Sequence, residues 1–324
     1  ISVFVPIILY TIGFSITQII IFYLLYNVIN VPMNFVSRRF IIWIGAKYTI
    51  IIGLIFETIY FIILYFANLT WNTLILLALT WAIYDTFYWV SHWFILDECL
   101  RRKKGIGKQF GALSIGNKIG EILAPAIGAA ILIFLNKNYL ILLSIVLFNL
   151  AIIPLTKIKL DYMVPRKVNT FKEFFKTKEN KINYISSGLS AFHSSIESVI
   201  LPLFVFITFE SIGAVGALAV IASFASIIMI YYVGRLSDKS NKRVLISIGA
   251  GAIALIWLAR LLFPEIIIIY ITTLIAGFMV ILIMIPLDSK LLEDGRKSKA
   301  MLDVSTYRNV SLMSANILLY GGIY

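Results

Sequence analysis

The chain has 324 residues, of which 60% are hydrophobic and 14% are charged, and its formal net charge is +12. A soluble domain usually carries about 25% charged residues, so this composition excludes an ordinary water-soluble protein and predicts that lipid is the solvent. The basic residues stand in short clusters between apolar runs and not along one face, which argues against a nucleic-acid partner. The single cysteine, Cys99, excludes an internal disulfide.

Ten segments are long and apolar enough to cross a bilayer, since a spanning helix needs about 20 residues. In chain order they are 1–29, 41–67, 71–96, 111–135, 138–156, 183–207, 212–233, 244–263, 265–287 and 305–324. The predicted fold class is therefore all-α, a polytopic membrane protein. Both ends of the chain lie inside apolar runs, so we expect the chain to be a fragment of a longer protein.

The connections between these segments carry the charge. When the connections are assigned alternately to two sides, all of the 28 Lys and Arg except Lys137 and Arg260 fall on one side. The positive-inside rule assigns that side to the cytoplasm. We expect a multi-pass protein of the plasma membrane.

The longest connection, 157–182, is predicted to be a cytoplasmic linker between an N-terminal helical bundle, 1–156, and a C-terminal bundle, 183–324. Weak similarity between the Leu96-Asp97 and Leu287-Asp288 regions favours parallel repeats, as in some transporters. The run Thr170 to Lys176 has the pattern of a short amphipathic helix lying on anionic lipid. A solvated linker is the equal alternative.

Four carboxylates fall well inside the expected spans: Glu57, Asp85, Glu121 and Glu197. Charged groups at that depth cost about 2.5–3.5 kcal/mol on insertion scales, so each needs a reason. Helical spacing places Asp85, Trp89 and His92 on one face, and His193 and Glu197 on one face of another helix. Lys118 and Glu121 are spaced for an ion pair.

These side chains are candidates for binding a polar or cationic solute or for proton coupling: Asp85, Trp89, His92, Lys118, Glu121, His193 and Glu197. A neutral, hydrogen-bonded structural role is the alternative for each of the titratable groups. Trp89 could stack on a substrate or pack between helices. For Glu57 the structural interpretation is preferred.

The run from Gly234 to Arg243 reads GRLSDKSNKR and resembles the signature loop of the major facilitator superfamily, with Gly234, Arg235, Asp238 and Arg243 at motif positions. Asn241 stands where a second glycine is usual. The resemblance implies that the ten spans are helices two to eleven of twelve, and that the helices of the 71–96 and 183–207 spans line the central cavity. It also implies that Asp238 latches onto the start of the fifth helix, near 107–111. A charged turn that only sets topology is the alternative.

A second resemblance lies in the fifth helix. The run from Gly120 to Ala129 is similar to the family motif associated with exporters, with Gly120, Pro125 and Gly128 retained and alanine in place of two glycines. Small residues allow helices to approach closely. The resemblance implies export.

We therefore expect a monomeric secondary active transporter that binds a small-molecule substrate in the lipid bilayer and works by alternating access with proton coupling. A non-transporting receptor or scaffold with the same fold is the alternative. No HExxH, Gly-x-Ser-x-Gly or phosphate-binding Gly-Lys-Ser/Thr sequence is present, so we expect no enzyme activity, no metal site and no cofactor.

Overall fold

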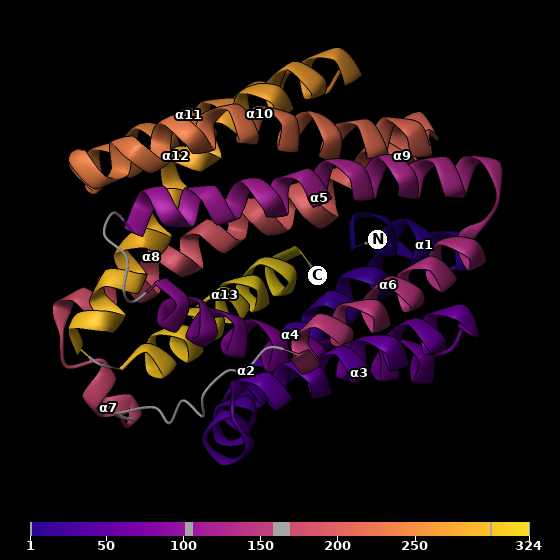
Figure 1. Ribbon diagram of the computed structural model, residues 1–324. Helices are drawn as coiled ribbons and strands as arrows, with labels where there is room; N and C mark the ends of the chain where they lie inside the picture. Colours follow the sequence, from indigo (N-terminus) through magenta and orange to yellow (C-terminus); the bar gives the residue numbers. More distant parts are fainter. Residues whose placement is uncertain (1, 101–105, 158–168, 299, 324) are drawn as a thin grey trace. The chain divides into compact units, whose positions relative to one another are not determined.

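Figure 1 shows the computed structural model, which describes residues 2–100, 106–157, 169–298 and 300–323, without the side chains of 97–100, 106–113, 238 and 239. Every regular element in these residues is helical. In chain order the α-helices are α1 (Val5–Ile12), α2 (Ile16–Ile44), α3 (Ala46–Tyr65), α4 (Trp71–Leu100), α5 (Ile106–Phe134), α6 (Lys137–Lys157), α7 (Phe171–Phe174), α8 (Lys178–Ser195), α9 (Leu201–Phe209), α10 (Ile212–Lys239), α11 (Lys242–Leu262), α12 (Ile266–Ser298) and α13 (Met301–Ile323).

Nine helical stretches within the described ranges are long and apolar enough to cross a membrane, which confirms the all-α, polytopic fold class. Eight of them match expected spans from 41–67 onward, and α2 takes the place of the first. The last expected span, 305–324, corresponds to α13, which has the length but is not among the nine. The side chains of Asp303, Arg308 and Asn309 make α13 more polar than its neighbours.

The bounds of the first expected span, 1–29, are wrong. The chain breaks at Gly13, whose φ of +113° is readily adopted only by glycine. Ser15 then caps a new helix, because its hydroxyl accepts a bond from the backbone N–H of Gln18 while the Gln18 side chain accepts one from the N–H of Ser15. As a result α1 is a separate short helix, and α2 continues through Pro32 to Ile44.

The chain divides by packing into two compact units, each described here by itself. The α2–α13 unit comprises Val5–Cys99, Lys137–Glu197 and Gly295–Tyr324. The α5–α10 unit comprises Ile1–Phe4, Leu100–Asn136 and Ser198–Asp294. Each unit contains helices from both halves of the sequence. The division into bundles at 157–182 remains a prediction.

In the α2–α13 unit, α13 packs along α2 and α8, and α3 packs along α6. An aromatic cluster lies between α2, α3 and α4. The ring centroids of Tyr26, Tyr60 and Phe22 are 4.6, 5.6 and 5.8 Å from that of Trp81. Tyr320 of α13 stacks on Tyr23 at 5.4 Å. This packing brings the four helices together around the polar groups described below.

In the α5–α10 unit, α5 packs along α10. The contacts are made by small residues. A Cβ atom on Gly216 of α10 would come 2.7 Å from the Cβ of Ala129 on α5, and one on Gly277 of α12 would come 2.5 Å from the carbonyl oxygen of Ala222 on α10. No larger residue fits at these two positions without a shift of the helices.

The segment between α8 and α9 is a π-helical turn, Ile196–Ile200. Pro202 follows at the start of α9 and has no N–H to bond the preceding turn, so the helix widens there instead of ending. Glu197 lies within this turn. π-Helical turns are frequent at functional sites.

Candidate functional site

A stripe of polar side chains runs along α2, on the face formed by Tyr23, Asn27, Asn30, Asn34 and Arg38. These residues are three or four positions apart, and each is at most 8% exposed. We name this face the α2 polar stripe. Polar groups inside a membrane protein are expensive unless they are hydrogen-bonded, so the stripe marks the interior of the α2–α13 unit as a candidate site.

The Asp85 carboxylate of α4 meets the middle of this stripe. It accepts a hydrogen bond from Asn30 Nδ2 at 2.8 Å and a longer one from Asn309 Nδ2 of α13 at 3.5 Å. The hydroxyl of Tyr26 is a third donor. Asp85 itself is 8% exposed. The sequence placed Asp85 deep in a span, and the structure shows that side chains from α2 and α13 surround it.

Carboxamides complete the network between α2 and α13. Asn34 donates to Asn30 Oδ1 at 2.9 Å, and Asn309 donates to Asn34 Oδ1 at 2.8 Å. Three helices, α2, α4 and α13, are thus joined by one set of buried bonds. Sequence analysis missed all three asparagines.

Trp89 and His92 lie further along α4, on the side of Tyr88. The His92 ring stacks on Tyr88 with centroids 5.6 Å apart, and Trp89 meets His92 edge-on at 5.5 Å. Trp89 is 39% exposed. Arg308 of α13 packs over the Trp93 ring at 4.3 Å and lies within electrostatic range of both His92 and Asp85. No described hydrogen bond joins His92 to Asp85 directly.

His193 and Glu197 are half-buried on α8 and the π-helical turn. Between them, Ser195 donates to Asn316 Oδ1 of α13 at 2.7 Å. Both residues therefore lie on a helix that packs against α13, which also contributes Asn309 to the Asp85 network. Their roles in binding or coupling remain predictions.

Lys118 and Glu121 form the expected ion pair in α5. The side chains are 24% and 51% exposed, within a segment that is apolar enough to span a membrane. Charged groups at that depth rarely face lipid, and a role for this pair in lining a water-filled path remains a prediction.

The signature run covers the end of α10 and the start of α11. Arg235 is exposed and packs over the Tyr231 ring at 4.3 Å, and Gly234 is buried. Asn241 caps α11, because its Oδ1 accepts a bond from the N–H of Arg243 at 3.0 Å, which accounts for asparagine at this position. Lys242 pairs with Glu293 of α12 at 2.5 Å. The structure does not describe the side chains of Asp238 or of 107–111, so the latch predicted for Asp238 lies outside the described residues.

The α5 motif divides into an open part and a packed part. Gly120 has open space around it, whereas Gly128 is buried. The carbonyl oxygen of Pro125 and the methyl group of Ala129 contact α10 at Gly216. The close approach expected from small residues is therefore confirmed only for the second half of the motif.

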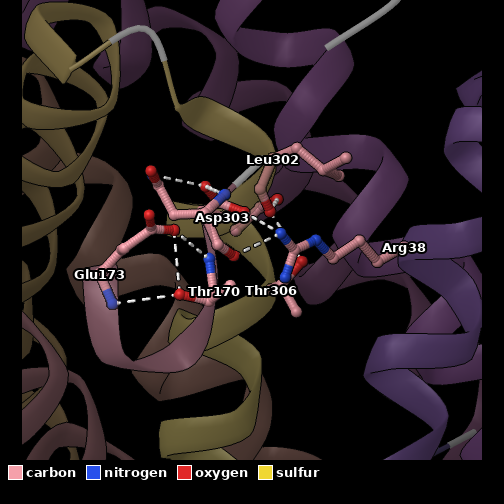
Figure 2. Close-up of polar contacts among 8 residues, drawn as sticks. Arg38, Thr170, Glu173, Leu302, Asp303 and Thr306 are labelled. Atoms are coloured by element: carbon pink, nitrogen blue, oxygen red, sulfur yellow. Dashed lines mark hydrogen bonds and ion pairs between the residues drawn. The ribbon is translucent and has the colours of Figure 1, made fainter. Parts of the chain in front are cut away.

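A buried ion pair lies at the end of the α2 polar stripe. Arg38 NH2 is 2.6 Å from Asp303 Oδ1 of α13, and these side chains are 10% and 0% exposed. Asn169, just before α7, donates its backbone N–H and its Nδ2 to Asp303 Oδ2, both at 2.8 Å, and its carbonyl oxygen accepts from Arg38 at 2.8 Å. Figure 2 shows Arg38 beside Asp303. We name Arg38, Asn169 and Asp303 the Arg38 clamp.

The short helix α7 continues directly from the clamp. Thr170 and Glu173 form a capping box that starts it, as Figure 2 shows. Phe174 is 5% exposed and stacks on Tyr307 of α13 at 4.2 Å. Phe174 thus packs on protein, whereas Phe171 is 60% exposed, and the lipid-bound and solvated alternatives for this segment both remain predictions.

Apolar helices of spanning length with a buried polar network among them define a polytopic α-helical membrane protein. Residues 1–306 match the family model described as Major Facilitator Superfamily. The chain belongs to that family, which confirms the resemblance seen in the signature loop.

Solved structures show the same fold. A bacterial homologue of the iron transporter ferroportin in an outward-facing state is similar with a TM-score of 0.69 and 12% identity, over 98% of this chain and 86% of that one. The human organic anion transporter MFSD10 (TETRAN) is similar with a TM-score of 0.66 and 11% identity, over 97% and 81%. No curated protein sequence matches the chain.

Proposed function

We propose that this protein is a secondary active transporter that moves a small polar organic solute by alternating access and is driven by protons. The family and the two transporter structures support the transport function. One of those structures is titled as an iron transporter and the other as an organic anion transporter, so the fold alone selects no substrate. The substrate must therefore be selected by the residues of this chain.

The observation that carries the proposal is the Asp85 network. Asp85 and Asn30 come from the first half of the sequence and Asn309 comes from the second. If α2 and α13 separate during transport, the bonds of Asn309 to Asn34 and Asp85 must break, and a solute with hydrogen-bond donors can replace them. A buried group left without such a replacement would cost about 1–3 kcal/mol. Solute binding would thereby be coupled to helix separation.

The Arg38 clamp supports alternating access from a second position. Its three residues join α2, α13 and the middle of the linker on the side predicted to be cytoplasmic. We assign it the role of a gate that is closed when the ion pair is formed. Export is the proposed direction and rests on the α5 motif alone.

The test is flux in reconstituted vesicles. Purified protein is first screened for thermal stabilisation by metabolites and drugs, and each hit is then tested for uptake into vesicles with and without a pH gradient. We expect at least one hit to move faster with the gradient, and Asp85→Asn to reduce that flux at least tenfold because a neutral amide cannot replace the carboxylate acceptor. Glu265→Gln, an exposed carboxylate outside the network, is the matched control.

Binding of a solute without flux in any condition would favour the receptor or scaffold alternative. Flux that is equal with and without a pH gradient would retain transport and remove proton coupling.

A further inference from the structure

Glu57 of α3 is a buried carboxyl group that is not part of the hydrogen-bond network around Asp85. It is 5% exposed. One turn earlier, α3 lies tightly against α4: a Cβ atom on Gly53 would be 3.2 Å from Phe87 Cβ and 3.3 Å from the carbonyl oxygen of Tyr84. Because α3 approaches α4 this closely, the next turn carries Glu57 into the interior of the α2–α13 unit and not onto its surface.

Four polar atoms in this interior have no hydrogen-bond partner among the described residues. They are Glu57 Oε2, Asn27 Oδ1 and the hydroxyl oxygens of Tyr23 and Tyr60. The rings of Tyr23 and Tyr60 both contact Trp81, at 5.8 and 5.6 Å, which gathers them around one side chain. Unpaired buried polar atoms are rare, and several together indicate a site for something that the chain itself does not supply.

Glu57 and Asp85 differ in the donors they receive. Asp85 accepts bonds from Asn30, Asn309 and Tyr26, and such donors offset part of the cost of burying a carboxylate. Glu57 Oε2 receives none. An ionised carboxylate without donors is among the most expensive groups to bury, whereas a protonated carboxyl group is neutral and has an O–H to donate.

Among the described side chains, the titratable groups that act on Glu57 are two tyrosines and one carboxyl group. Tyr60, Tyr84 and Asp85 are within electrostatic range of it. From α2 the titratable groups of this interior are Tyr23 and Tyr26. From α13 they are Tyr320, which stacks on Tyr23, and Arg308, which is within electrostatic range of Asp85. On α6, which packs along α3, the titratable residues stand at the two ends: Lys137, Tyr139 and Lys157. A second negative charge beside Asp85 would be unfavourable, which again favours a neutral Glu57.

We propose that Glu57 is the residue that binds the coupling proton, and that Asp85 serves as a hydrogen-bond acceptor in the network with Asn30 and Asn309. This assignment rests on the proposed function, because a coupling proton requires a transport cycle. It also reverses the preference for a structural Glu57 that follows from the sequence. In the cycle, Glu57 releases its proton when separation of the helices admits water to the four unpaired atoms, and it takes up a proton before they close.

Infrared difference spectroscopy during pH changes tests the proposal on the whole chain in lipid, with the proton itself as the probe. At neutral pH we expect the band of a protonated carboxyl group, with the frequency shift in D2O that marks an exchangeable proton. Glu57→Gln should remove this band, Asp85→Asn should retain it, and Glu210→Gln, an exposed carboxylate, is the matched control. Circular dichroism verifies that each variant is folded. If Glu57→Gln does not fold, Glu57→Asp is used and should shift the band.

Three results would overturn the assignment. The band could be missing from the unmodified protein, or it could be lost in Asp85→Asn and retained in Glu57→Gln. It could also develop only when Na⁺ is replaced by choline, which would identify Glu57 as a sodium site. None of these spectra requires flux, so the proton assignment and the transport function can fail separately.

Discussion

Two helix pairs, α2 with α13 and α5 with α10, join the two halves of the sequence, and they are built from opposite kinds of contact. Between α2 and α13 the contacts are directional and polar: the Asn34–Asn309 bond of 2.8 Å and the Arg38–Asp303 pair of 2.6 Å. Between α5 and α10 the contacts are made by small residues, with Gly216 against Ala129 and the carbonyl oxygen of Pro125.

The type of contact indicates which helix pair changes more in energy between two conformations of the protein. The energy of a buried hydrogen bond or ion pair changes strongly when the bond breaks, because separation leaves buried donors and acceptors without partners. Contacts between methyl groups and backbone are short-ranged and non-directional, so a small rotation changes their energy less. We infer that α2 and α13 form the state-dependent contact, and that α5 and α10 form a close-packed pivot. The following substitutions break or sharpen this comparison.

The largest effect is expected at the Arg38 clamp. Asp303→Asn leaves the Arg38 guanidinium buried without its charged partner, and removal of one partner from a buried ion pair costs about 3–5 kcal/mol. We expect a marked drop in the melting temperature, measured by tryptophan fluorescence in detergent. The double variant Arg38→Gln, Asp303→Asn should recover part of the loss, because no unpaired charge remains. Equal melting of the single and double variants would show that the pair contributes no coupling.

A smaller effect is expected at the pivot. Gly216→Ala places a methyl group 2.7 Å from Ala129 Cβ, and overpacking of this kind costs about 1–3 kcal/mol. Ala129→Gly removes the opposing methyl group and should restore the melting temperature in the double variant. Gly251→Ala, at a glycine of α11 with open space around it, is the control. Destabilisation by the control equal to that at Gly216 would contradict close packing as the cause.

The smallest effect on stability is expected at Lys118 and Glu121. If this half-exposed pair faces a water-filled path, replacement of both by glutamine should change the free energy of unfolding by at most about 1 kcal/mol. The same variant should alter flux if the pair lines the path. A loss of stability as large as that in the clamp variant would show that the pair lies in a dry environment, which would contradict a water-filled path beside α5.

Much of the fold and part of the site follow from the sequence, and the reasons differ from residue to residue. The signature loop is local, so its family and its position between two helices could be identified from ten consecutive residues. Asp85 could be found because a lone carboxylate is conspicuous in an apolar run. The spacing of Asn27, Asn30, Asn34 and Arg38 was equally visible in principle. It was missed because the first span was expected to end at 29, which cut the α2 polar stripe in two.

Glu57 shows where sequence reasoning stops. From the sequence it is one carboxylate in an apolar helix, without face partners such as Trp89 and His92, which made Asp85 a candidate. The structure separates them by their partners, which come from other helices: Asn30, Asn309 and Tyr26 for Asp85, and none for Glu57 Oε2.

The sequence by itself determined that this is an all-helical membrane protein of the major facilitator superfamily, because hydrophobicity, charge asymmetry and a loop motif are properties of neighbouring residues. Only the tertiary structure decided that α2, α4 and α13 share one buried network, that the linker is held by Asp303, and that Glu57 Oε2 has no hydrogen-bond partner among the described residues. These contacts join side chains that are up to 279 positions apart in the sequence, as between Asn30 and Asn309. Such contacts depend on how the helices pack, and no local pattern encodes them.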